Sequence, residues 1–289
     1  MTWQPSDEQQ RQYQRDGYFI VPHAIERDTA IEVRGVIRDH ILKPEHEVGG
    51  NQRDPMDPMG DSPEARAARF RKLGQLCVTS PLIWHTIHAG PLMPRIAQHF
   101  LGDDLLLKFN SCFLKPARTG SATPWHQDNG LWRDGETQPF NFWIAIDPAT
   151  KANGCMQFIP GTHREPIETH GMYEGSIHGE LPRQSVAACQ AKYGLHHIEL
   201  APGDAVCWHS SLYHYSPPNT SECGRIAVAG VYSTPALADR NLRFKRYEWV
   251  MRGGAILGVF PPQMHEASGE AAPLPKFPDF EPTAVARRT

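Results

Sequence analysis

The sequence has no apolar run close to the roughly 20 residues that a membrane-spanning helix needs. It also lacks a secretory signal, because Met1-Thr2-Trp3-Gln4-Pro5 leads into a polar, charged segment rather than a basic patch followed by an apolar stretch. These two absences predict a soluble cytoplasmic protein with no membrane partner.

Closely spaced cysteines are missing as well. The six cysteines are scattered along the 289 residues and form no C-x-x-C pair. A chain of this length can bury a core large enough to be stable without disulfide bonds, so we expect the cysteines to be reduced thiols.

No block of lysine or arginine is present, and the 29 basic and 32 acidic residues are interspersed. Without a cationic track for phosphates, nucleic acid is not an expected partner. What is present is an ordinary globular composition, with 40% hydrophobic and 21% charged residues.

The first part of the chain, about residues 1–102, has helical patterns. Ser6 followed by Gln9 marks a helix start, Gly17 its end, and residues 18–21 form a β-rich run. Further helices are expected over about 28–42, 63–73 and 82–101, the second of these following a loop from 45 to 63 rich in glycine and proline. This loop is either a plain connection or a lid over a site.

From about residue 103 to 235, short β-rich runs follow one another without regularly interleaved helices. Such a pattern predicts an antiparallel sandwich or barrel, mainly β with flanking α-helices. A C-terminal extension of about 236–289 is expected to wrap the surface or to be partly disordered, and the whole chain, 1–289, is expected to be a single domain. The runs are 105–109, 140–146, 156–159, 205–208 and 226–232.

The segment Pro124-Trp125-His126-Gln127-Asp128 is the first candidate for chemistry. If it is extended, the imidazole of His126 and the carboxylate of Asp128 project from the same face. Because the chain has 15 histidines, one H-x-D triplet is expected by chance, and a surface histidine near an aspartate would look the same.

A later segment holds two more histidines, His209 and His214. A distant histidine can complete a site of two histidines and one carboxylate, which leaves coordination positions of an iron open for other ligands. Arg225 then begins an apolar run, where a guanidinium facing the interior would be costly unless a bound carboxylate paired with it. The alternative is that Arg225 points into solvent.

An ordered set of motifs resembles the phytanoyl-CoA dioxygenase family. The set comprises H-Q-D at 126–128, Asn153-Gly154-Cys155-Met156 before Pro160-Gly161-Thr162-His163, the glycine-aspartate pair before His209, H-x-S at 214–216, Arg225, and the early Asp16-Gly17-Tyr18-Phe19-Ile20-Val21. The resemblance implies a double-stranded β-helix core of the jelly-roll, cupin-like kind. It also implies iron(II) held by His126, Asp128 and His214, with 2-oxoglutarate and dioxygen as co-substrates.

The same resemblance suggests roles for other residues. Arg225 and Ser216 would hold the distal carboxylate of 2-oxoglutarate, and Trp143 would line its pocket, although Trp143 could equally be a core aromatic. Ser111 and Asn110 are weaker pocket candidates. His209 would be structural or would support the metal ligands, because only His214 has both the following serine and the matching distance to Arg225. Since Asp128 fills the position that halogenases of this family leave to halide, hydroxylation or a related two-electron oxidation is expected instead of halogenation.

The substrate is expected to be a small metabolite or natural-product intermediate, since no cluster of lysine and arginine demands the phosphates of coenzyme A. Two other functions fit the same residues: a catalytically inactive protein of this fold that binds 2-oxoglutarate and metal, and a zinc-dependent hydrolase. Candidate substrate contacts flank the metal ligands and are Asn129, Trp132, Arg133 and Tyr213.

Overall fold

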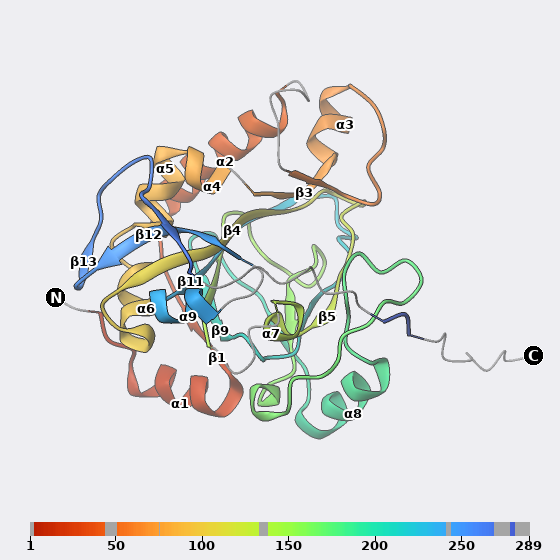
Figure 1. Ribbon diagram of the computed structural model, residues 1–289. Helices are drawn as coiled ribbons and strands as arrows, with labels where there is room; N and C mark the ends of the chain where they lie inside the picture. The colour runs from red at the N-terminus through yellow and green to blue at the C-terminus, as the bar shows by residue number, and fades with distance from the viewer. Residues whose placement is uncertain are drawn as a thin grey trace, which may run out of the picture.

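Two antiparallel β-sheets pack face to face at the centre of the computed structural model (Figure 1). The structure describes residues 3–43, 51–74, 76–132, 138–240, 244–268 and 278–280. The larger sheet has the order β1 (Tyr18–Val21), β9 (Ala205–His209), β6 (Phe140–Ala145), β11 (Arg225–Ser233), β4 (Leu105–Lys115), β12 (Arg246–Arg252) and β13 (Ala255–Ile256). The smaller sheet has the order β5 (Thr123–His126), β10 (His214–Ser216), β7 (Met156–Phe158) and β8 (His196–Ile198).

Three short strands extend the larger sheet at its edges. The hairpin of β2 (Asn51–Arg53) and β3 (Phe70–Leu73) pairs with β4, and β14 (Met264–Glu266) pairs with β12.

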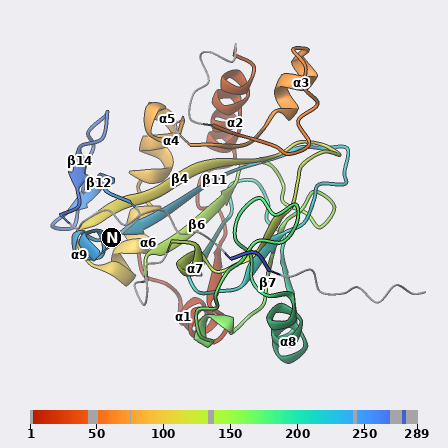
Figure 2. The same cartoon turned by 45° about the vertical axis from the view of Figure 1, so that its right-hand side comes forward.

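Most of the N-terminal helices pack against one face of the larger sheet. The N-terminal helices are α1 (Asp7–Asp16), α2 (Arg27–Ile41), α3 (Pro63–Ala68), α4 (Leu76–Thr79), α5 (Pro81–Ile83), the π-helix η2 (Trp84–His88) and α6 (Met93–Leu101). The later ones are α7 (Asp128–Trp132), the 3₁₀-helix η3 (Thr162–Arg164), α8 (Arg183–Tyr193) and α9 (Pro235–Arg240). In both views α8 lies at the opposite side of the molecule from α2 (Figures 1 and 2).

Strand β11 shows why the larger sheet is apolar on both faces. All of its residues are buried, and alternate side chains enter different cores. Ile226 and Val228 belong to the core between the sheet and the helices, whereas Ala227 and Ala229 belong to the core between the two sheets. The small side chains of the second pair leave room between the sheets, where the cavity described below lies.

The sandwich predicted for the middle of the chain is confirmed, and so is the first helix. The side chain of Ser6 accepts a hydrogen bond from the backbone N–H of Gln9, and Gly17 ends α1 in the left-handed region at φ 83°. The chain can then turn directly into β1, which pairs with β9.

Other local predictions were wrong. Residues 70–73 form β3 instead of ending a helix, and the single helix expected over 82–101 is broken after η2. A side-chain β-carbon at Gly90 would lie 2.2 Å from the carbonyl oxygen of Thr86, so the backbone folds back tightly at this break.

Helix α8 was not predicted, and two further segments differ from expectation. Only Val186 is buried in α8, so the helix carries no apolar stripe to reveal it. Within the loop expected at 45–63, residues 51–53 form β2, while 44–50 lie outside the described residues. The C-terminal extension contributes β12 to the larger sheet.

No helix in the described ranges has the length and apolar character needed to cross a membrane. The six cysteines are free thiols, as expected. The assignment of the whole chain to a single domain stays a prediction.

Candidate metal centre

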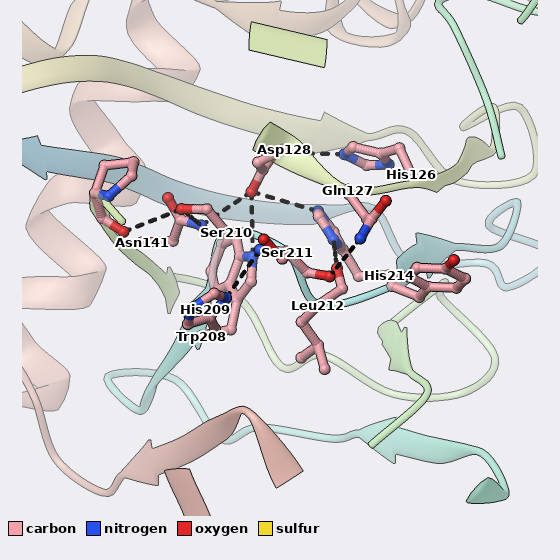
Figure 3. Close-up of polar contacts among 12 residues, drawn as sticks. His126, Gln127, Asp128, Asn141, Trp208, His209, Ser210, Ser211, Leu212 and His214 are labelled. Atoms are coloured by element: carbon pink, nitrogen blue, oxygen red, sulfur yellow. Dashed lines mark hydrogen bonds and ion pairs between the residues drawn. The ribbon is translucent and has the colours of Figure 1, made fainter. Parts of the chain in front are cut away.

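Three side chains from β5, α7 and β10 point toward one another (Figure 3). His126 ends β5 and His214 begins β10, and the two are direct partners in this antiparallel pair of strands. Asp128 begins α7 two residues later. One potential ligand atom from each of the three residues lies within 4.8 Å of the others, and all three side chains are buried. The convergence expected from the sequence is therefore present.

The turn between His126 and Asp128 differs from the extended segment assumed above. The strand stops at His126, so strand alternation does not bring the two side chains together. Instead the fully buried Gln127 fixes the turn: its side-chain amide donates to the Ser211 carbonyl at 3.0 Å and accepts from the Glu168 backbone N–H at 2.9 Å. As a result, His126 Nε2 lies 3.6 Å from Asp128 Oδ1, and His214 Nε2 lies 3.8 Å from Asp128 Oδ2.

Both imidazoles are oriented by hydrogen bonds to the backbone. The Nδ1–H of His126 donates to the Pro124 carbonyl at 2.7 Å, and that of His214 donates to the Leu212 carbonyl at 2.9 Å. A carbonyl only accepts, so each ring carries its proton on Nδ1 and turns a lone pair on Nε2 toward Asp128. Burial lowers the pKa of His214 to about 4, which keeps that ring neutral and able to bind a cation.

Two side-chain N–H groups fix the carboxylate of Asp128 by hydrogen bonds. Its Oδ2 accepts from Asn141 Nδ2 at 3.0 Å and from Trp208 Nε1 at 3.2 Å. Burial by itself would raise the pKa of Asp128, but His214, His126 and the Trp208 N–H outweigh it, and the pKa is lowered. One carboxylate and two imidazoles fit a divalent transition metal such as iron(II).

His209 is not part of this cluster. It ends β9, where its Nδ1 accepts from the Ser211 backbone N–H at 3.1 Å, and its ring packs 5.4 Å from that of His163. Its position agrees with the structural role expected for it.

Arg225 lies at the opposite side of the same cavity. Its side chain is 3% exposed, and its Nη1 donates to the Gly154 carbonyl at 2.7 Å. Its Nε is buried and has no hydrogen-bond partner. Burial lowers the pKa of Arg225 to about 10, so the guanidinium remains charged at neutral pH. An unpaired donor on a buried cation fits a bound carboxylate.

Of the other four predicted pocket residues, two line the cavity and two do not. Trp143 and Ser216 line the cavity, with the Trp143 ring 5.0 Å from the Arg225 guanidinium and the Ser216 hydroxyl donating to the Gly154 carbonyl at 2.8 Å. Ser111 and Asn110 do not line it, and the hydroxyl of Ser111 donates to the Leu73 carbonyl instead.

Of the predicted substrate contacts, only Trp132 lines the cavity. Asn129 donates to the Ser211 hydroxyl at 2.9 Å, and Tyr213 packs in a separate core around Ile159 and Leu181. Arg133 lies outside the described residues.

The cavity has a volume of about 310 Å³ and includes residues that the sequence motifs did not single out. They come from β3, β4, β9, β10 and the segment before α8, and no short motif marks them, since each depends on tertiary pairing. They include Arg71, Lys72, His178, Tyr215, Phe109 and Trp208. The His178 ring lies 4.8 Å from that of His126.

Comparison with known proteins gives a consistent result. The family model described as phytanoyl-CoA dioxygenase (PhyH) matches residues 13–227. L-proline trans-4-hydroxylase of Streptomyces griseoviridis is 24% identical over 249 residues, which cover 78% of this chain and 86% of that protein.

Solved structures share the fold. EctD from S. alaskensis with 2-oxoglutarate and 5-hydroxyectoine superposes with a TM-score of 0.66 at 19% identity, covering 95% of this chain and 88% of that one. The same enzyme with bound Fe gives a TM-score of 0.64 at 18% identity, covering 83% and 79%. The predicted fold class, a cupin-like double-stranded β-helix with flanking helices, is thereby confirmed.

Proposed function

The chain belongs to the phytanoyl-CoA dioxygenase family and is an iron(II)- and 2-oxoglutarate-dependent oxygenase, and we propose that His126, Asp128 and His214 hold its iron. The observation that carries the assignment of these ligands is their convergence within 4.8 Å. The fixed Nδ1 protons and the ionised carboxylate support it, because they leave three lone-pair donors facing one point.

Arg225 and Ser216 bind the distal carboxylate of 2-oxoglutarate. Arg225 offers an unpaired Nε–H beside its bonded Nη1, so the guanidinium can grip a carboxylate without giving up Gly154. Trp143 packs near the guanidinium and restricts its movement. Through these contacts Arg225 and Ser216 would position the co-substrate in the cavity that the metal ligands also line.

Bound iron and 2-oxoglutarate supply, with dioxygen, an oxidant strong enough to attack an unactivated C–H bond. The protein contributes orientation and exclusion of water. Two histidines and one carboxylate would hold the metal and would leave it able to bind small molecules. Apolar walls from Phe109, Trp132 and Met156 keep the space dry. Asp128 occupies the position that a halide would need, which favours hydroxylation or a related two-electron oxidation over halogenation.

The substrate is a small molecule. The cavity volume of about 310 Å³ is at the lower end of the usual range for ligand pockets. A relative that hydroxylates the free amino acid L-proline supports a substrate of this size.

The proposal is tested by the conversion of 2-oxoglutarate to succinate in the presence of iron(II). We expect succinate to form only when dioxygen is supplied, and to disappear in His126→Ala and Asp128→Ala. Binding of 2-oxoglutarate without succinate in any substrate screen would indicate an inactive binding protein. Turnover that continues without dioxygen would indicate a zinc hydrolase.

A further inference from the structure

Two adjacent cations from β3, Arg71 and Lys72, line the metal-site cavity. Arg71 Nη2 donates to the Thr123 hydroxyl at 3.2 Å, at the first residue of the strand that ends in His126. Lys72 Nζ lies 4.7 Å and 4.9 Å from the ring centres of Phe109 and Phe113. Both cations therefore lie on the wall of the space that the metal ligands face.

Arg71 has no ion-pair partner among the carboxylates of the described ranges. Asp54 is the acid whose charge acts on it, but the Asp54 carboxylate accepts from the backbone N–H groups of Met56 and Ser121 and from the Ser121 hydroxyl. Burial lowers the pKa of Arg71 in spite of Asp54. The guanidinium is thus partly desolvated without a matching anion, which is an unfavourable state.

The side chains that line the cavity carry an excess of positive charge. Among the described lining residues, Arg71, Lys72 and Arg225 are the lysines and arginines, and Asp128 is the acid. With the proposed cofactors bound, the two charges of iron(II) offset those of 2-oxoglutarate, and Asp128 offsets Arg225. The Arg71 guanidinium then still faces the cavity without an anion.

We infer that, granted the proposed function, the substrate is a small organic anion whose carboxylate or phosphate group binds against Arg71, with Lys72 beside it. Its carbon body lies between the aromatic side chains that line the same cavity, Phe109, Trp132 and Phe244. Arg71 is the specificity-determining residue, because its planar fork can bind two oxygens of one anionic group. The site would discriminate against a neutral analogue, since the Arg71 guanidinium would then stay desolvated without an anion.

The test uses the full chain loaded anaerobically with iron(II) and 2-oxoglutarate. The probes are carboxylic acids from butanoate to decanoate and 3-phenylpropanoate, each with its primary amide, together with the corresponding alkyl phosphates. Binding is followed by tryptophan fluorescence and by the change in the visible absorption of the loaded protein. We expect at least one anion to bind roughly ten-fold or more tightly than its amide, and this preference to be lost in Arg71→Gln.

Arg71→Lys should keep part of the preference, and Lys72→Gln should weaken it even if Arg71→Gln fails to fold. Arg27→Gln, at an exposed arginine on α2, is the matched control and should behave as wild type. A preference for phosphates over carboxylates would identify the anionic group as a phosphate ester.

Two results would overturn the inference. One is equal binding of acids, phosphates and amides across the panel, and the other is an unchanged preference in the Arg71 and Lys72 variants. A third would reassign Arg71: loss of 2-oxoglutarate binding in Arg71→Gln would mean that it serves the co-substrate. Absence of 2-oxoglutarate binding in the wild type would instead refute the proposed function.

Discussion

At the scale of single residues, the metal site depends on side chains that do not touch the metal position. Asn141 and Trp208 are partners across β6 and β9, and both donate to the same oxygen of Asp128. Because these two bonds fix Oδ2, the second oxygen, Oδ1, is held in one orientation toward the proposed metal position. Supporting contacts of this kind usually contribute strongly to metal affinity.

Removal of the Trp208 N–H should therefore weaken metal binding. For Trp208→Phe we expect the affinity for iron(II), measured by anaerobic titration, to fall roughly 10- to 100-fold. Trp84→Phe is the control, because Trp84 also donates its indole N–H, to the Val259 carbonyl at 3.1 Å, but lies in the helical layer. Both variants should lose about 1 kcal/mol of stability. Equal metal affinity in the two variants would refute the role of Trp208.

The residues proposed to hold the metal and the co-substrate could be picked out from the sequence, whereas the residues that hydrogen-bond to them could not. His126 and Asp128 are close in the chain, and Arg225 stands out as a charge beside an apolar run. Asn141 and Arg71 carry no such mark, because each gains its role only when a distant strand pairs beside it. Ser111 illustrates the opposite error: it lies on a strand near the site but bonds to Leu73.

At the scale of elements, the turn before β7 supports the two residues that we propose bind the co-substrate. The Gly154 carbonyl accepts from both Arg225 and Ser216, and Gly154 has φ 82°. A side-chain β-carbon there would lie 2.4 Å from the Pro217 carbonyl oxygen. The turn therefore requires glycine for its conformation and for the close approach of the next strand.

Gly154→Ala should displace this carbonyl and weaken 2-oxoglutarate binding. Gly194→Ala is the matched control, since Gly194 also has φ 82° but a β-carbon added there would meet no atom within 4 Å. Each variant should lose roughly 1 to 2 kcal/mol from the left-handed conformation. Only Gly154→Ala should also lose affinity for 2-oxoglutarate in a titration, and a similar loss in both would contradict this account.

Whether an element could be predicted depended on whether its signal was local. The capping residues Ser6 and Gly17 fixed α1 correctly, because capping involves neighbours in the chain. Strand β3 was mistaken for the end of a helix, since its pairing with β4 involves residues about 40 positions away. Helix α8 was missed because its exposed surface shows no apolar periodicity.

At the scale of the whole molecule, the two sheets hold the metal ligands and Arg225 on opposing walls of one cavity. The proposed metal ligands lie on β5 and β10 of the smaller sheet and at the start of α7. Arg225, in contrast, lies on β11 of the larger sheet. The β-sandwich was predictable from the run of short strands. The cavity was not, because its lining residues come from many strands of both sheets.

Because ligands would join these two walls, binding should stabilise the whole fold. At a hundred-fold excess over its Kd, a ligand specific for the folded state adds about 2.7 kcal/mol. We expect separate increases in Tm on adding iron(II) and then 2-oxoglutarate under anaerobic conditions, measured by differential scanning calorimetry. Arg225→Gln should keep the first increase and lose the second, and an unchanged second increase would exclude Arg225 from the co-substrate site.

The most direct test of the metal centre is the visible charge-transfer absorption of the anaerobic complex with iron(II) and 2-oxoglutarate, compared between His214→Ala and His209→Ala. Both histidines are buried and lie five residues apart in the chain, but only His214 meets His126 and Asp128. We predict that the wild type and His209→Ala show the band and that His214→Ala does not. A folded wild-type protein without the band, or a His214→Ala variant that retains it, would contradict the assignment.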